Sequence, residues 1–498
     1  MAETEKDKQP AADKPEKSDE ETKKPKEEPE KPPVVTQHEL TLGDKTLKYT
    51  VTTGMMPLKE VASGETEANI FFIAYTLAGV TETAKRPLVF AFNGGPGSAS
   101  VWLHLGAIGP KRVKMQDEGW MPAPPYQLVD NEHTWLDVAD VVFIDPVGTG
   151  YSRATKEEHN KKFWGVQGDI EAVGEFIRLY LTRYRRWSSP LFLAGESYGT
   201  TRSAGLAGHL INKGIAFNGI ILISTVLNFQ TDTFERGNDL PYALFLPTYT
   251  ATAWYHHKLP PDLQSRDLRS VLDEVEAWAE SDYMTALAKG DRLTKAERNT
   301  MIRQLARYTG LKRSYIDQTN LRIQIMRFCK ELLRDEKYTV GRLDSRFKGR
   351  DALAVTEMFE FDPAMVAITP PYTATLNHYV RAELGYETDI EYETLSFKTN
   401  QAWEWERGKF PDTSEALRSA LAKNPYLKVF IGRGYYDLAT PHFAAQYTFS
   451  HMDINPELVS NLVTADYPAG HMFYLDLASL AKLKKDIVAF LELALRQS

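Results

Sequence analysis

Short apolar runs alternate with amphipathic segments along much of the chain. Four runs of four or five residues, at 88–92, 141–144, 191–194 and 220–223, are entirely apolar. Between the second and third runs, residues 170–184 carry apolar side chains at spacings of three and four, the pattern of an amphipathic helix. Strands that are apolar on both faces and alternate with helices predict a mostly parallel sheet with helices on both faces.

Further strand patterns lie on either side of this region. Residues 38–52 alternate around a Gly-Asp pair as a β-hairpin would, and residues 68–77 form another strand pattern. Strand patterns return at 427–431 and 462–464, and the amphipathic stretch 477–496 predicts a closing helix. We therefore predict one sheet that draws its strands from both halves of the chain.

The pattern changes between about residues 240 and 369, where long charged amphipathic segments replace the apolar runs. One segment opens with Thr294-Lys295-Ala296-Glu297, which has the residues of a helix-capping box. We interpret this stretch as a helical insertion that forms a cap. The predicted organisation is a tail at 1–33, a first part of the α/β domain at 34–239, the cap at 240–369 and a second part of the α/β domain at 370–498.

Composition narrows the classes of protein that fit the chain. The 498 residues are 43% hydrophobic and carry a net charge of −8, which supplies a large core and argues against a nucleic-acid partner. No apolar run approaches the roughly 18 residues that span a membrane, so no membrane span is predicted. Cys329 is the single cysteine, which excludes internal disulfides, and its helical spacing favours core packing over a reactive thiol.

The first 33 residues contain no Val, Leu, Ile, Phe, Trp or Tyr and consist mostly of Lys, Glu, Asp and Pro. Such a segment cannot bury enough apolar surface to offset its ordering entropy, so it is predicted to be disordered. It lacks the charged-then-apolar pattern of a secretion signal. Two interpretations follow: a cytoplasmic protein, or a chain whose signal has been removed and whose tail is the linker behind it.

The stretch Gly195-Glu196-Ser197-Tyr198-Gly199 carries the strongest chemical signal. It lies between an apolar run and a segment of small residues, which predicts a strand, a sharp turn with the serine at its apex, and a helix start. Flanking glycines permit a strained backbone that exposes the hydroxyl, and the N–H group after the serine is free to stabilise an oxyanion. The alternative is a turn without a catalytic role.

A serine nucleophile needs a base, and the base needs an acid to orient it. In this architecture both follow later strands, the acid first. Asp437 follows the strand pattern at 427–431, and His471 follows the pattern at 462–464. His442 lies too close to Asp437 for another strand to intervene, and His451 falls at a predicted helix end. Asp437 and His471 are therefore the predicted acid and base, the alternative for His471 being a turn histidine bound to the backbone.

The loop Asn93-Gly94-Gly95-Pro96-Gly97-Ser98 follows the run at 88–92 and is predicted to supply the second oxyanion donor. Its glycines let the backbone approach a substrate carbonyl closely. A phosphate-binding loop and a plain turn are the alternatives, although the Gly-Lys-Ser/Thr ending of a nucleotide loop is missing. His256-His257 has no carboxylate or cysteine at ligand spacing, so neither a metal nor a cofactor is predicted.

Together these blocks resemble the serine carboxypeptidases. The resemblance rests on the loop at 93–97, the stretch Asp145-Pro146-Val147-Gly148-Thr149-Gly150-Tyr151-Ser152, the turn at 195–199, Asp437, and Gly470-His471-Met472, in the family's order. It implies an α/β-hydrolase fold with a helical insertion and the removal of single residues from peptide C-termini. Peptides or proteins with a free C-terminus would be the substrates.

The resemblance also implies a role for each residue. Ser197 would be the nucleophile, His471 the general base and acid, and Asp437 its orienting partner. The N–H groups of Gly95 and Tyr198 would form the oxyanion hole, and Asn93, Glu196 and the Gly94 N–H would hold the terminal carboxylate of the substrate. Tyr198 and Met472 would either line side-chain pockets or pack in the core.

Glu196 and two departures from the family pattern affect the expected pH range. An ionised carboxylate repels another, so Glu196 would bind a terminal carboxylate best when protonated, below neutral pH, unless it only packs at the turn. Ala107 stands where several members have a glutamate that supports this site, which leaves the strength of the acid preference open. Ser98 stands where many members have a disulfide-bonded cysteine; bacterial members commonly lack such bridges.

The leading hypothesis is a serine carboxypeptidase that works through an acyl-enzyme. An esterase or acyltransferase on the same scaffold is the first alternative, and a non-catalytic binding protein with a hydrolase fold is the second. Members of the family generally work in secretory or acidic compartments. The resemblance therefore favours a periplasmic or secreted protein, with the cytoplasm as the alternative.

Overall fold

A ten-stranded sheet runs through the computed structural model, which describes residues 31–406 and 408–496. Nine strands follow one another in the order β1-β2-β3-β7-β4-β9-β10-β13-β14, and β8 pairs with β3 outside this path. The strands are β1 (Val34–Leu42), β2 (Lys45–Lys59), β3 (Thr66–Leu77), β4 (Leu88–Phe92), β7 (Asp140–Ile144), β8 (Arg153–Ala154), β9 (Leu191–Ser197), β10 (Gly219–Thr225), β13 (Lys428–Gly434) and β14 (Leu462–Tyr467). Nearly all of the predicted disordered tail lies outside the described residues.

The sheet is mostly parallel, as the apolar runs predict. Each neighbouring pair from β7 to β14 along the path is parallel. The antiparallel pairs are β1–β2, β2–β3, β3–β7 and β3–β8. The predicted hairpin at 38–52 is confirmed by β1 and β2, although β2 continues to Lys59. Sequence alternation marks the start of β2 but not its end, because the second half of this strand is buried on both faces.

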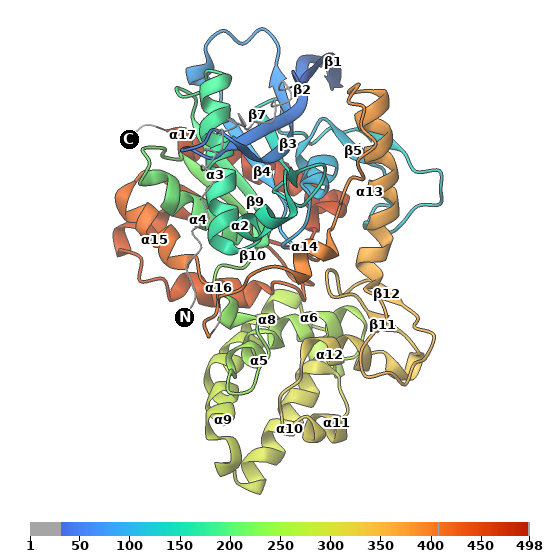
Figure 1. The fold of residues 1–498 in the computed structure, drawn as a ribbon. Coiled ribbons are helices and arrows are strands. Elements are labelled where there is room, and N and C mark those ends of the chain that lie inside the picture. Colours follow the sequence, from blue (N-terminus) through green and yellow to red (C-terminus); the bar gives the residue numbers. More distant parts are fainter. Residues whose placement is uncertain (1–30, 407, 497–498) are drawn as a thin grey trace, which may run out of the picture. The chain divides into compact units, whose positions relative to one another are not determined.

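Helices cover both faces of the sheet (Figure 1). Alternating residues of β4 point to opposite faces, so Val89 and Ala91 belong to one apolar cluster and Phe90 to the other. The first cluster includes α13 (Pro363–Ala382) and α17 (Leu477–Leu495), and the second includes α3 (Val166–Arg183), α4 (Tyr198–Ile211) and α15 (Ser414–Lys423). The predicted helix at 170–184 is α3, and the predicted closing helix is α17.

A group of helices between β10 and β13 packs around an apolar cluster of its own, which includes Tyr249, Val271, Leu305 and Phe328. Figure 1 places these green and yellow helices together beyond one end of the sheet. They are α5 (Leu240–Leu244), α6 (Leu246–Tyr255), α7 (Pro261–Gln264), α8 (Leu268–Trp278), α9 (Met284–Lys289), α10 (Lys295–Thr309), α11 (Arg313–Gln318) and α12 (Ile325–Glu331). The predicted capping box is present at the start of α10, where Thr294 and Glu297 exchange hydrogen bonds.

The predicted boundary of the helical insertion does not coincide with the end of a helix. Residue 369, the predicted boundary, falls inside α13, and Ile368 and Tyr372 of that helix pack against the sheet cluster. Leu438 and Phe443, which follow β13, join the cluster of the helical group instead. The two parts of the chain therefore share packed side chains at α16 (His442–Ser450).

Short elements complete the fold: β5 (Lys111–Val113), β6 (Leu128–Asp130), β11 (Thr339–Val340), β12 (Lys348–Gly349), α1 (Val101–Leu103), α2 (Asn160–Phe163) and α14 (Phe397–Gln401). Within residues 31–406 and 408–496, no helix combines the length and the apolar character needed to cross a bilayer.

Candidate active site

The backbone turns sharply at Ser197, where β9 ends and α4 begins at the next residue. Ser197 has φ 60° and ψ −130°, a strained conformation for a residue with a side chain. A Cβ atom at Gly195 would lie 2.2 Å from the carbonyl oxygen of Gly199, and one at Gly199 would lie 2.9 Å from that of Phe92. Positions 195 and 199 therefore both require glycine, as expected for the predicted turn.

Asp437 and His471 lie in the loops that follow β13 and β14, and their side chains are joined. His471 Nδ1 lies 2.8 Å from Asp437 Oδ2, and Asp437 is fully buried. Burial alone lowers the pKa of His471, but the charge and hydrogen bond of Asp437 outweigh it and raise the pKa above its usual value. The pair can therefore hold a proton on His471 that the imidazole has taken from a neighbouring group.

Asp437 is fixed in place by three further donors. The backbone N–H groups of Ala439 and Thr440 donate to Asp437 Oδ1 over 2.7 and 2.9 Å. The Thr440 hydroxyl donates to Oδ2 over 2.7 Å. These donors hold the buried carboxyl group in one orientation, which in turn orients the imidazole.

Ser197 and His471 come to the same edge of the sheet because parallel strands end together. Ser197 is the register partner of Thr225 at the end of β10. The neighbouring Ser224 donates its hydroxyl to the carbonyl of His471 over 2.6 Å. The strand ends therefore bring the predicted nucleophile, base and acid to one region of the molecule.

Residues 342–344, a segment that the sequence analysis did not identify, hold both loops. Leu438 donates its N–H group to the Arg342 carbonyl over 3.0 Å, and His471 donates its own to the Leu343 carbonyl over 2.6 Å. The N–H group of Gly470 donates to Asp344 Oδ2 over 3.0 Å. No motif marks this segment, because its contribution is made mostly by backbone atoms.

The glycine-rich loop after β4 packs directly on the start of α4. A Cβ atom at Gly94 would lie 2.5 Å from the Tyr198 nitrogen and 2.6 Å from the Gly199 nitrogen. Gly95 has φ 102°, which favours glycine. Arg202 donates to the Asn93 carbonyl over 2.7 Å and holds the loop in place. Two sets of backbone N–H groups, from the loop and from the helix start, therefore lie close together.

Glu196 is buried beside this loop together with Asn93. Burial raises the pKa of Glu196 to about 7, although the charge of His471 and a hydrogen bond from Tyr474 act in the opposite direction. Asn93 Oδ1 accepts the N–H group of Leu103 over 3.0 Å, whereas Asn93 Nδ2 has no hydrogen-bond partner among the described residues. The Asn93 amide nevertheless lies near enough to Glu196 to favour its ionised form, so an amide donor and a carboxyl group with a raised pKa lie together, which suits an anionic ligand.

Tyr474 is a further side chain at this site that the sequence did not reveal. Its hydroxyl donates to Glu196 Oε2 over 2.6 Å, although the two residues are 278 positions apart. The only sequence feature that could have pointed to Tyr474 is its position three residues after His471, in the same short loop. Periodicity does not distinguish such a residue from an ordinary core aromatic.

The remaining candidate residues lie in the core or outside the site. Tyr198 and Met472 are 1% and 6% exposed, and the Tyr198 ring packs against Trp403 at a centroid distance of 5.3 Å. Ala107 is fully buried, and Ser98 accepts the indole N–H of Trp102. His442 Nε2 lies 2.9 Å from Glu276 of α8, whereas His451 is exposed at the end of α16. Cys329 is buried, and burial raises the pKa of its thiol well above the usual range.

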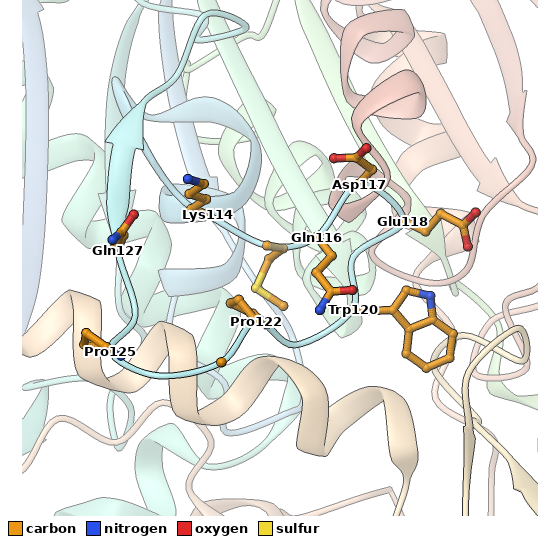
Figure 2. Close-up of a pocket in the computed structure, with 10 residues that line it drawn as sticks. Lys114, Gln116, Asp117, Glu118, Trp120, Pro122, Pro125 and Gln127 are labelled. Carbon is orange, nitrogen blue, oxygen red and sulfur yellow. The ribbon is translucent and has the colours of Figure 1, made fainter.

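An open cavity of about 670 Å³ lies along the loop between β5 and β6. Figure 2 shows the side chains that line it. Asp117, Glu118 and Trp120 lie along its rim, and Trp120 stacks on Phe347 at a centroid distance of 4.0 Å. None of the predicted site residues lines this cavity. Among the residues that the structure describes, no group of three or more His, Cys, Asp or Glu side chains is arranged to hold a metal ion.

A mostly parallel sheet with a strained serine turn at one strand end, and an Asp–His pair at two others, defines an α/β-hydrolase. Comparison with solved structures agrees: the prohormone-processing carboxypeptidase KEX1 from Saccharomyces cerevisiae matches with a TM-score of 0.56. That match covers 89% of this chain and 91% of the other at 16% sequence identity, and it concerns the fold alone. The sequence model of the serine carboxypeptidases matches residues 45–464, so the chain belongs to the serine carboxypeptidase family.

Curated relatives match over shorter stretches. Serine carboxypeptidase-like 5 of Arabidopsis thaliana is 29% identical over 155 residues, which cover 30% of this chain and 33% of the relative. The pheromone-processing carboxypeptidase KEX1 of Saccharomyces cerevisiae is 29% identical over 158 residues, covering 29% of this chain and 20% of the relative. The chain thus aligns with about a third or less of the length of these relatives.

Proposed function

We propose that the protein is a serine carboxypeptidase that removes residues from the free C-termini of peptides. The observation that carries the proposal is the buried Asp437–His471 hydrogen bond at the strand ends next to the strained turn at Ser197. Family membership and the fold support the same assignment.

In the proposed reaction, Ser197 attacks the carbonyl carbon of the last peptide bond while His471 takes the hydroxyl proton. The negative charge on the carbonyl oxygen is stabilised by the N–H groups of Gly95 and Tyr198. His471 then gives its proton to the leaving amine, and the peptide remains as an ester on Ser197. Water, deprotonated by His471, hydrolyses this ester and restores the serine.

Recognition of the free C-terminus is assigned to Asn93, Glu196 and the N–H group of Gly94. Protonated Glu196 donates to the terminal carboxylate, whereas ionised Glu196 repels it. Because burial raises the pKa of Glu196 to about 7, the proton is present below neutral pH and is lost above it. The proposal therefore includes a preference for acidic conditions.

An acidic working range fits a compartment outside the cytosol. We therefore include a periplasmic or secreted location in the proposal. Cell fractionation with antibodies against the native protein would test it, and recovery with cytosolic markers would refute it.

The decisive experiment is timed mass spectrometry of a peptide with a free C-terminus and of its C-terminal amide, at about pH 5 and about pH 7.5. We expect stepwise loss of single residues from the free acid, fastest at the lower pH and abolished in Ser197→Ala. If both peptides stay intact while Ser197 still reacts with a fluorophosphonate and hydrolyses a simple ester, the carboxypeptidase proposal fails in favour of an esterase or acyltransferase.

A further inference from the structure

Glu196 has a buried phenol as its hydrogen-bond donor. The Tyr474 hydroxyl lies 2.6 Å from Glu196 Oε2, and both side chains are buried. Burial also keeps the pKa of Tyr474 well above its usual value. The phenol therefore stays protonated, and stays a donor, over the whole range in which Glu196 titrates.

The phenol cannot easily move away from the carboxyl. Tyr474 lies in the short helical turn Phe473–Leu475 that follows His471, so one loop carries both the base and the phenol. Gly106 lies against the ring: a Cβ atom there would be 2.6 Å from Tyr474 Cε2 and 2.7 Å from the Tyr372 hydroxyl. Close packing at this density holds the hydroxyl where it is.

The groups that face Glu196 come from several elements and act in different directions. His471, Tyr474 and Asn93 favour its ionised form, whereas Asp437 disfavours it. Tyr372 of α13 also lies close enough to feel the charge of Glu196. Of these groups, Tyr474 is the one whose contribution depends on a single hydroxyl that has no part in moving the proton of Ser197.

We propose that Tyr474 is a positioning residue for Glu196 and sets the pH range in which the protein binds a terminal carboxylate. Its hydroxyl donates a hydrogen bond to Oε2, so the proton that Glu196 carries resides on Oε1. That proton then points in one fixed direction. The same hydrogen bond favours the ionised carboxyl, so it lowers the pH at which this proton is lost. The inference rests on the proposed function, because it assumes that Glu196 binds the substrate carboxylate.

The test is Tyr474→Phe, made in the full chain that also carries Ser197→Ala so that a bound peptide is not cleaved. The dissociation constant of a short free-acid peptide is measured by calorimetry between about pH 5 and pH 9. We expect the pH at which binding weakens to move up by about 0.5 to 1 unit when the hydroxyl is removed. We also expect binding at the lowest pH to weaken by about two- to fivefold, because the carboxyl is free to rotate.

Tyr372→Phe is the matched control, since it removes a neighbouring phenol hydroxyl that is not bonded to Glu196. The pH midpoint of peptide binding in Tyr372→Phe should equal that of the chain with native Tyr372. Replacement of Tyr474 by a ring-fluorinated tyrosine keeps the shape of the ring and strengthens the donor, so it should move the midpoint down. The fluorinated variant tests the role of the Tyr474 hydroxyl if Tyr474→Phe fails to fold.

An unmoved midpoint in Tyr474→Phe, or an upward shift with the fluorinated ring, would overturn the inference. If the free-acid peptide and its C-terminal amide bind equally well to the chain with native Tyr474, the proposed carboxylate site fails, and the inference fails with it. A preserved preference for the free acid with an unmoved midpoint would refute the role of Tyr474 alone.

Discussion

The proposed function assigns different roles to two buried carboxyl groups, those of Asp437 and Glu196. Asp437 accepts two backbone N–H groups and the Thr440 hydroxyl in addition to its hydrogen bond with His471. Burial raises the pKa of Glu196 to about 7, because it outweighs the charge of His471 and the hydrogen bond from Tyr474. In the proposed reaction the carboxyl group of Asp437 orients His471, and that of Glu196, while protonated, donates to the substrate carboxylate.

Replacement of Asp437 by asparagine should reduce kcat by roughly 10³- to 10⁴-fold, because the neutral amide neither stabilises a charged His471 nor fixes its tautomer. KM and the unfolding temperature should change little, since the shape is kept. Steady-state kinetics with the free-acid peptide measure the loss. Asp466→Asn is the control, as this carboxylate lies near the same sheet edge and pairs with Arg433. A loss below about tenfold in Asp437→Asn would contradict the proposed role.

Replacement of Glu196 by glutamine should make KM for the free-acid peptide nearly independent of pH. In the unaltered protein KM should be low below the Glu196 pKa of about 7 and rise above it, because the ionised carboxyl repels the substrate. An amide carries its N–H donors at every pH, so the rise should disappear. The measurement is KM, kept apart from kcat, from about pH 5 to pH 9. A rise of equal size in Glu196→Gln would assign it to another group.

Between elements, the site is held by contacts that join distant parts of the chain. The segment 342–344 lies between the helical group and α13, yet it bonds to the loops of Asp437 and His471. Asp344 also pairs with Arg346 over 2.7 Å, and both side chains are largely buried. The segment 342–344 therefore helps to hold the loops of Asp437 and His471 in place.

Asp344→Ala should reduce both stability and kcat. The change removes the acceptor of the Gly470 N–H group and leaves the buried Arg346 without that partner, which costs about 3 to 5 kcal/mol. Activity should fall about tenfold, because the loop of His471 loses one of its fixed points. Asp335→Ala, which breaks an exposed pair with Lys312, is the control and should change neither quantity measurably. Urea unfolding and kinetics measure both effects, and a full kcat in folded Asp344→Ala would refute the supporting role.

Over the whole molecule, the features that could be predicted from the sequence are those that a local pattern of residues specifies. The apolar runs predicted the parallel strands, and the glycines around Ser197 predicted the turn. Each of these features depends mainly on residues that are close together in the sequence. The partners Tyr474–Glu196 and Asp344–Gly470 lie 278 and 126 positions apart. Their pairing depends on how the strands and the helical group assemble, and no periodicity records it. For the same reason the predicted boundary at 369 missed the continuation of α13.

The helical group and the sheet are predicted to unfold together. Leu438, next to Asp437, is fully buried in the apolar cluster of the helical group, as is Phe443 of α16. The core of the proposed cap thus includes the residue after Asp437, so loss of packing in the cap is expected to disturb the proposed site. Unfolding followed by circular dichroism, tryptophan fluorescence and residual activity should give one coincident transition.

Leu438→Ala tests this coupling directly. Removal of the buried side chain should lower the free energy of unfolding by about 2 to 5 kcal/mol and lower kcat as well, because the cavity lies against the loop of Asp437. Leu353→Ala removes the same atoms from a side chain that is 60% exposed and should change neither quantity. If the helical group melts in a separate transition, or if Leu438→Ala is destabilised with full activity, then the cap folds independently of the catalytic site.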